Sequence, residues 1–127
     1  GAELTRIVER ETVELRRRVE AYRGDREPLS LRDRTVIVVD DGVATGVTDT
    51  AALREVHRHR PRRLILAVPV CPPDSLARLR EEADQILCLV APPRLQGVGQ
   101  WYADFSQVAD DEVIDILARA HSRDVTA

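Results

Sequence analysis

A run of four β-branched apolar residues, Val36 to Val39, ends directly at two aspartates and a loop rich in glycine and threonine. The run predicts a fully buried strand, and the pattern from Thr48 to Val56 predicts a helix. The loop 42–47 therefore precedes a helix N-terminus, where backbone N–H groups are unpaired and the helix dipole is positive. We expect an anion site there, most naturally one for phosphate.

The two halves of this stretch favour different ligand groups. Backbone amides and the hydroxyls of Thr45 and Thr48 can surround a phosphate, whereas the carboxylates of Asp40 and Asp41 would repel one. The carboxylates fit a ligand that also carries hydroxyl donors or a divalent cation, so a sugar phosphate with Mg²⁺ satisfies both halves. The alternative is a structural turn that binds nothing, but an uncompensated pair of aspartates is a poor choice for such a turn.

The stretch from Val36 to Thr48 resembles the phosphoribosyl-pyrophosphate (PRPP) motif of the type I phosphoribosyltransferases: an apolar strand, two acidic residues, a short spacer and Thr-Gly-x-Thr. The resemblance implies that Asp40 and Asp41 are the catalytic pair and hold the ribose 2′- and 3′-hydroxyls, while 44–48 wrap the 5′-phosphate. It implies transfer of phosphoribosyl from PRPP to a nitrogenous base, with Mg²⁺ as cofactor. The expected substrate-binding residues are Asp40, Asp41, Gly42, Val43, Ala44, Thr45, Gly46, Val47, Thr48 and Trp101.

A loop rich in proline and glycine, 91–105, contains the only tryptophan and the only phenylalanine of the chain. Its aromatic side chains could stack on a nucleobase or pin the loop to the core, and composition alone favours pinning. Residues 98–107 also resemble the Val-Gly-x-Trp-Tyr-x-Asp-Phe-Ser-Gln tail of a group of bacterial phosphoribosyltransferase-like proteins. The resemblance implies that Trp101 lies near the base and that Asp104 is close to the metal and pyrophosphate.

Two further apolar runs, 64–68 and 85–90, alternate with helical segments, so the predicted order is β-α-β-α-β. Right-handed crossovers make the three strands parallel, and ligands bind at the carboxyl edge of such a sheet. We expect Asp74 or Ser75 to cap a short helix that continues to Glu82. The expected fold class is α/β, a Rossmann-like parallel sheet with flanking helices, similar to a type I phosphoribosyltransferase but without its N-terminal strands.

We expect one domain over 1–127, with a charged amphipathic helix and linker at 1–28 and a core at 34–120. The first helix carries a narrow apolar stripe at Leu4, Val8, Leu15 and Val19, which would pack on a neighbouring domain or on a copy of itself. A last helix is expected from about Asp110 to Ala120. With the motif strand at an exposed apolar edge, these features predict a homo-oligomer or a partner that supplies the missing N-terminal half.

The composition narrows the class of protein. The net charge of −3 argues against nucleic acid as a partner, and the apolar runs are too short to cross a membrane. Two valines followed by two aspartates at a strand end are also typical of response-regulator receivers. That fold needs a lysine at the site, whereas all 19 basic residues other than histidine are arginines here, which argues against a receiver. We expect Cys71 and Cys88 to be buried free thiols in a reducing compartment, which makes the expected location cytoplasmic.

Two positions bear on the acceptor base. The residue before Thr45-Gly46 is Ala44, where the 6-oxopurine enzymes of the family have an aspartate, so hypoxanthine and guanine are disfavoured. Leu95 stands where relatives often have an aromatic residue. The ligand is therefore expected to be PRPP or a nucleoside 5′-monophosphate, and the alternative to a transferase is a non-catalytic module that senses PRPP or nucleotides.

Overall fold

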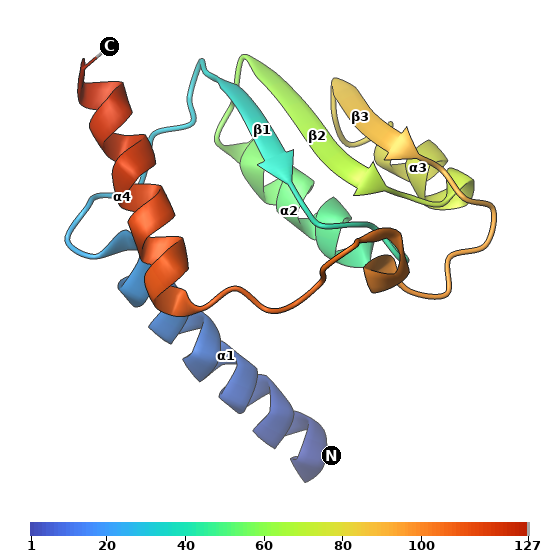
Figure 1. Ribbon diagram of the computed structural model, residues 1–127, viewed down its shortest axis with the longest axis horizontal. Helices are drawn as coiled ribbons and strands as arrows, with labels where there is room; N and C mark the ends of the chain where they lie inside the picture. The colour runs from blue at the N-terminus through green and yellow to red at the C-terminus, as the bar shows by residue number, and fades with distance from the viewer. Residues whose placement is uncertain (127) are drawn as a thin grey trace. The chain divides into compact units, whose positions relative to one another are not determined.

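The structure, a computed structural model, describes residues 1–126. The chain forms two compact units, Ser30–Phe105 and a second that joins Gly1–Leu29 to the chain from Ser106 onward, and each is described by itself. The elements are, in order, α1 (Ala2–Arg23), β1 (Thr35–Val39), α2 (Val47–Arg58), β2 (Arg63–Val70), α3 (Pro73–Leu79), β3 (Gln85–Val90), the 3₁₀ helix η1 (Val98–Trp101) and α4 (Asp110–Thr126) (Figure 1).

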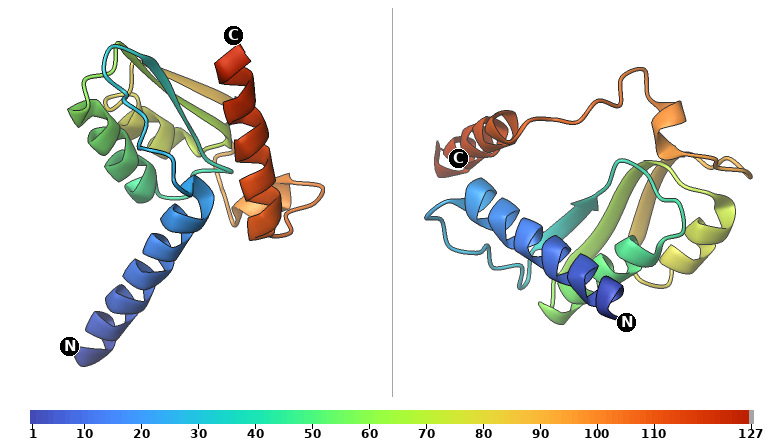
Figure 2. Two further views of the ribbon diagram at one scale, coloured as in Figure 1. Left: turned by 90° about the vertical axis from the view of Figure 1, so that its left-hand side faces the viewer. Right: turned by 90° about the horizontal axis from the view of Figure 1, so that it is seen from below.

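The unit Ser30–Phe105 is built on a parallel sheet of three strands in the order β1-β2-β3. Thr35 pairs with Arg63 at the start of β1, and Ile65 pairs with Gln85 across the other side of β2. Helices α2 and α3 lie on the same face of this sheet (Figures 1 and 2). The predicted parallel α/β fold is confirmed, and β1 lies at the predicted edge.

The core of this unit lies between the sheet and its two helices. Leu66 in β2, Leu53 in α2 and Leu79 in α3 are completely buried, and Leu64 is almost so. Alternate residues of β2 point to this layer, because successive side chains of a strand face opposite sides of the sheet. The layer continues to Val43 in the loop after β1, so the loop is part of the core rather than an appendage to it.

The opposite face of the sheet is exposed, and this corrects the prediction that Val36 to Val39 is fully buried. Val36 and Val38 pack on the core, whereas Ile37 is 56% and Val39 is 73% exposed. Leu89 in β3 is 86% exposed on its strand. Within Ser30–Phe105 both helices cover one face only, so a continuous apolar run in the sequence becomes a strand with one packed side and one open side.

Two local predictions for the middle of the chain were wrong. Helix α3 begins at Pro73 after an N-cap at Pro72 and ends at Leu79, so neither Asp74 nor Ser75 caps it and it stops before Glu82. Strand β2 is longer than the predicted run 64–68, because it continues through Pro69 to Val70. Proline is tolerated there because the β1 ladder ends at the Val39–Ala67 pair, and the pairs with β3 skip Pro69.

In the other unit, α1 packs against α4, and Asp110 at the start of α4 holds the contact. Arg17 Nη1 lies 2.8 Å from Asp110 Oδ2, and the Tyr22 hydroxyl donates to Asp110 Oδ1 over 2.8 Å. The predicted apolar stripe of α1 is exposed, with Leu4 at 64%. Helix α4 is longer than predicted and extends to Thr126.

Of the helices described between residues 1 and 126, none combines the length and apolar character that crossing a bilayer requires. Both cysteines are free thiols, but only Cys71 is buried, while Cys88 is partly exposed. Burial raises the pKa of the Cys71 thiol to about 11, so this side chain is protonated at neutral pH and serves as part of the core.

The variant Leu66→Ala tests the core. It should lower the free energy of unfolding by about 2–5 kcal/mol, because removal of a completely buried leucine leaves a cavity between the sheet and both helices. Urea unfolding measures the difference. Leu89→Ala is the matched control, since Leu89 is largely exposed on β3, and an equal loss in both variants would contradict this assignment of the core.

Candidate functional site

The acidic turn is fixed by β2, which extends beyond the end of β1. The Asp40 N–H donates to the Ala67 carbonyl over 3.4 Å, and the Val43 N–H donates to the Val70 carbonyl over 2.9 Å. Between these bonds the chain leaves the sheet, and the Asp41 N–H donates instead to Asp40 Oδ1 over 2.8 Å. Two carboxylates are thus held at the carboxyl edge of the sheet, where ligands bind in this class of fold.

The loop then turns into α2 through Gly46, whose φ of 81° lies in the left-handed region that favours glycine. Val43 is buried in the core, so only its backbone can face a ligand, whereas Thr45 and Thr48 are exposed. Within residues 1–126 we find no protein acceptor for the backbone N–H of Thr45, Gly46 or Thr48. The unpaired amides of exposed Thr45 and Thr48, with that of the buried Gly46 between them, lie at the start of a helix of 12 residues and form an arrangement that favours an anion.

Asp49, in the first turn of α2, is a buried carboxylate that the sequence analysis did not single out. It is 6% exposed and lies beside Asp40. Partial burial raises the pKa of the Asp40 carboxyl above its ordinary value, and the Asp49 carboxyl raises it further, against the Asp41 N–H, which lowers it. Burial and the neighbouring Asp40 also raise the pKa of Asp41. The site concentrates acidic groups that a hydroxyl-bearing or cationic ligand would stabilise.

The segment after β3 is fastened to the acidic turn at two points. The Tyr102 hydroxyl donates a short hydrogen bond to the Asp41 carbonyl. Val98 lies so close to Gly42 that a Cβ on Gly42 would come within 2.6 Å of Val98 Cγ1 and 2.8 Å of Val70 Cγ1. Glycine at position 42 is therefore required by this close approach, and η1 forms a wall next to the carboxylates.

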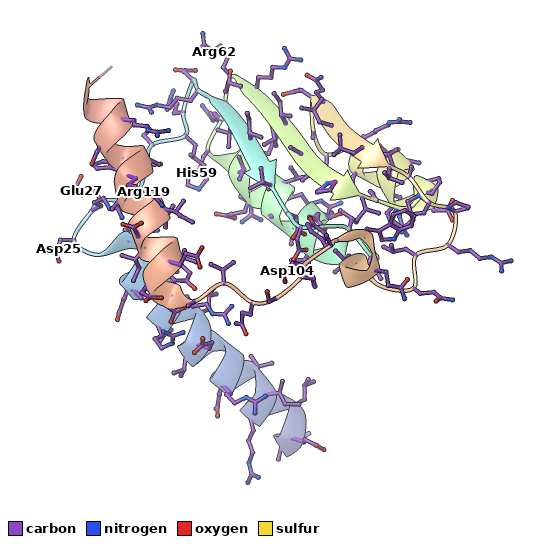
Figure 3. The ribbon with its side chains drawn as sticks, viewed as in Figure 1. Asp25, Glu27, His59, Arg62, Asp104 and Arg119 are labelled. Carbon is purple, nitrogen blue, oxygen red and sulfur yellow. The ribbon has the colours of Figure 1, made fainter. Side chains whose placement is uncertain are left out.

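The aromatic side chains of this wall divide between the two predicted roles. Tyr102 and Phe105 contact each other with ring centroids 5.1 Å apart, and Tyr102 pins the segment to the turn. Trp101 on η1 is 47% exposed and so retains a free surface. Asp104 lies in the exposed chain that follows η1 (Figure 3).

A shallow hollow of about 390 Å³ lies beside the loop, against the first turns of α2 and Arg78 of α3. Neither Asp40 nor Asp41 takes part in it, so it is distinct from the predicted ribose position. Its lining residues are Thr45, Gly46, Val47, Thr50, Ala51, Arg54 and Arg78.

The described part of the chain contains no group of three or more histidine, cysteine, aspartate or glutamate side chains arranged to hold a metal ion. The carboxylates present are nevertheless hard oxygen donors, which suit Mg²⁺ when substrate phosphates supply the other ligands. The donor set thus fits a cation that arrives with its ligand better than one bound by the protein alone.

The structure brings the predicted residues 40–48 together in one turn and loop, and it places η1 with Trp101 on the same turn. Four residues that shape the site were not among the predicted site residues: Asp49, Ser75, Arg78 and Tyr102. Asp49 could have been found as an acid in the first turn of a helix whose N-terminus was already predicted. Ser75, Arg78 and Tyr102 act on the turn and loop from distant parts of the sequence, and of these only Tyr102 lies in a segment, 98–107, for which a role at the site was predicted.

The variant Gly42→Ala tests the contact between the turn and η1. It should cost about 1–3 kcal/mol of stability, because the new methyl group overlaps two branched side chains with little freedom to move. The double variant Gly42→Ala with Val98→Ala should recover part of this loss. Denaturant unfolding of the native chain, the two single variants and the double variant gives the coupling energy. Additive effects would show that Val98 does not lie on Gly42.

The raised pKa of Asp40 predicts a pH dependence of stability. A carboxyl whose pKa is higher in the folded chain binds more protons there than in the unfolded chain, so stability falls as pH rises above the ordinary value of 3.8. Asp40→Asn should be more stable than the native chain at neutral pH, and this difference should shrink toward pH 3. Urea unfolding across this range measures it, with Asp74→Asn, an exposed acid of α3, as the control. A difference that is the same at every pH would contradict the prediction.

Comparison with known proteins agrees with this geometry. A family model described as "Phosphoribosyl transferase domain" matches residues 5–102. Two Mycobacterium tuberculosis proteins, from strains CDC 1551 and H37Rv and each named "Putative phosphoribosyl transferase", are 40% identical over 121 residues. The match covers 95% of this chain but only 27% of each relative.

Two solved structures resemble the fold. The TT1426 protein from Thermus thermophilus superposes with a TM-score of 0.76 at 40% identity, over 91% of this chain and 55% of that one. The AQ2163 protein from Aquifex aeolicus gives a TM-score of 0.50 at 30% identity, over 58% of this chain and 36% of that one. Because the family model covers more than half of the chain, the chain belongs to the phosphoribosyl transferase domain family.

Proposed function

We propose that this chain binds PRPP through the turn and loop 40–48 and forms the phosphoribosyl-binding part of a transferase. The observation that carries this proposal is the set of unpaired amides at Thr45, Gly46 and Thr48 next to the carboxylates of Asp40 and Asp41. Amides suit the 5′-phosphate, and carboxylates suit the ribose hydroxyls. Neither half alone would suit a ribose phosphate as well.

In this proposal Asp40 and Asp41 accept hydrogen bonds from the ribose 2′- and 3′-hydroxyls, and their negative charge stabilises the positive charge that develops at C1′. A deprotonated ring nitrogen of the base forms the new bond to C1′, while the bond from C1′ to the pyrophosphate oxygen breaks and pyrophosphate leaves with the electron pair. Mg²⁺, held by Asp104 and the ligand's phosphates, would neutralise the leaving group. Trp101 would offer its exposed face to the base.

The chain spans about a quarter of the length of the curated relatives that it matches. We therefore propose that the complete transfer reaction needs further chain, either from a second copy or from the rest of a longer protein. The exposed face of the sheet, with Ile37, Val39 and Leu89, is the surface that such a partner would cover.

A second candidate is a module that binds PRPP or a nucleoside 5′-monophosphate without turnover. The observation in its favour is the position of Leu95, a partly buried aliphatic residue rather than an aromatic one that could stack on a base. This candidate shares the binding site of the first and differs only in the absence of product.

Thermal unfolding with PRPP and Mg²⁺ tests binding. A ligand that binds the folded chain only must stabilise it, by about 2.7 kcal/mol at 100 times its dissociation constant, so the melting temperature should rise. The double variant Thr45→Ala with Thr48→Ala should lose most of this rise, because both hydroxyls flank the loop amides. Thr50→Ala, further along α2, is the matched control and should respond as the native chain does.

One outcome would refute both candidates, and another would decide between them. An unchanged melting curve for the native chain would refute the binding proposal. Stabilisation without release of pyrophosphate, when adenine, uracil or orotate is supplied to the complete protein, would favour the sensing module over the transferase.

A further inference from the structure

Helix α3 donates two side-chain hydrogen bonds to consecutive carbonyl groups of the loop. The Ser75 hydroxyl donates to the Ala44 carbonyl over 3.1 Å, and Arg78 Nη2 donates to the Thr45 carbonyl over 3.2 Å. Arg78 Nη2 also lies 3.4 Å from Ser75 Oγ, so the two donors form one group on a single face of α3. Ser75 is 3% exposed, whereas Arg78 is exposed, so this group of donors runs from the interior to the surface of the protein.

These bonds fix the direction of the amides that follow. In a trans peptide the N–H points opposite to the C=O of the same peptide unit. The structure contains no cis peptide bond within residues 1–126. With the Ala44 and Thr45 carbonyls turned toward α3, the N–H groups of Thr45 and Gly46 must point away from it, and we find no acceptor for either among the described residues.

The charge of Arg78 adds to this arrangement. Within the described side chains Arg78 forms no ion pair, unlike Arg54 on α2, which lies 2.7 Å from Glu82. Because the hydrogen bonds of Arg78 go to a neutral carbonyl and a neutral hydroxyl, no carboxylate among the described side chains offsets its positive charge next to the loop. That charge favours an anion on the loop without contact between Arg78 and the anion.

We propose that Ser75 and Arg78 are positioning residues, which orient the Thr45 and Gly46 amides toward the 5′-phosphate of the ligand. This inference rests on the proposed function for its consequence but not for its geometry. A free loop would have to order these peptide units during binding, at a cost in conformational entropy. With both carbonyls held by α3, the amides already have the required direction before the ligand arrives.

The experiment compares Ser75→Ala and Arg78→Ala with the native chain, by two measurements. Residual dipolar couplings of the Thr45 and Gly46 amides, without ligand, report the direction of each N–H. Calorimetry with PRPP and Mg²⁺ reports affinity. Each variant should change both couplings and weaken PRPP binding roughly tenfold, since each loses one hydrogen bond that holds the loop.

Two controls separate positioning from a general loss of structure. Arg80→Ala removes an equal charge from the C-cap of α3, and no contact of Arg80 with the loop is found in the described part of the chain. It should leave couplings and affinity as they are in the native chain. Arg78→Lys retains a charged donor and should recover part of the PRPP affinity. If Arg78 had only a structural role, Arg78→Lys and Arg78→Ala would weaken binding equally.

Unchanged couplings in both alanine variants, or PRPP affinities within twofold of the native value where PRPP binds, would overturn the inference. Altered couplings in a chain that does not bind PRPP would instead refute the proposed function and leave the positioning role of α3 in place. The two failures therefore have different signatures.

Discussion

The apolar layer between the sheet and its two helices is the constraint on which the candidate site depends. Leu53, Leu66 and Leu79 come from α2, β2 and α3 and meet in this layer with no exposed surface. Val43 belongs to the same layer, so the chain between β1 and α2 is anchored in its middle. The aspartates before Val43 and the loop after it are therefore tied to the core at a residue between them, in addition to their hydrogen bonds with β2 and α3.

This anchoring explains how one short stretch can carry groups of opposite preference. Burial raises the pKa of Asp40, and the neighbouring carboxyl of Asp49 adds to the cost of the ionised form. On the other side of Val43 the loop exposes amides and the N-terminal end of α2, which favour negative charge. A ligand that stabilises both sides must carry donors at one end and an anion at the other, and this is a stricter requirement than either side imposes alone.

Sequence reasoning succeeded where the signal was local. The strand, the two aspartates and the glycine–threonine loop follow one another without a gap, and the helices between successive strands favour parallel pairing. It failed where the outcome depends on which elements meet in space. The exposure of Ile37 depends on the helices covering one face only, and Ser75 acts on a loop 31 residues before it. Tyr102 reaches Asp41 across 61 residues. Periodicity contains no information about such distant contacts.

The short length of α3 has a consequence for affinity. The helix has 7 residues, of which only Ser75 and Leu79 are buried, so we expect it to open locally more readily than the paired strands. Each opening would release the carbonyls of Ala44 and Thr45 and allow the peptide units that follow them to turn. The apparent dissociation constant of any anion on this loop equals the intrinsic value divided by the fraction of molecules in which α3 is closed. Heating or added denaturant would thus weaken binding at temperatures or concentrations well below those of global unfolding. The cause would be the opening equilibrium of a single helical segment.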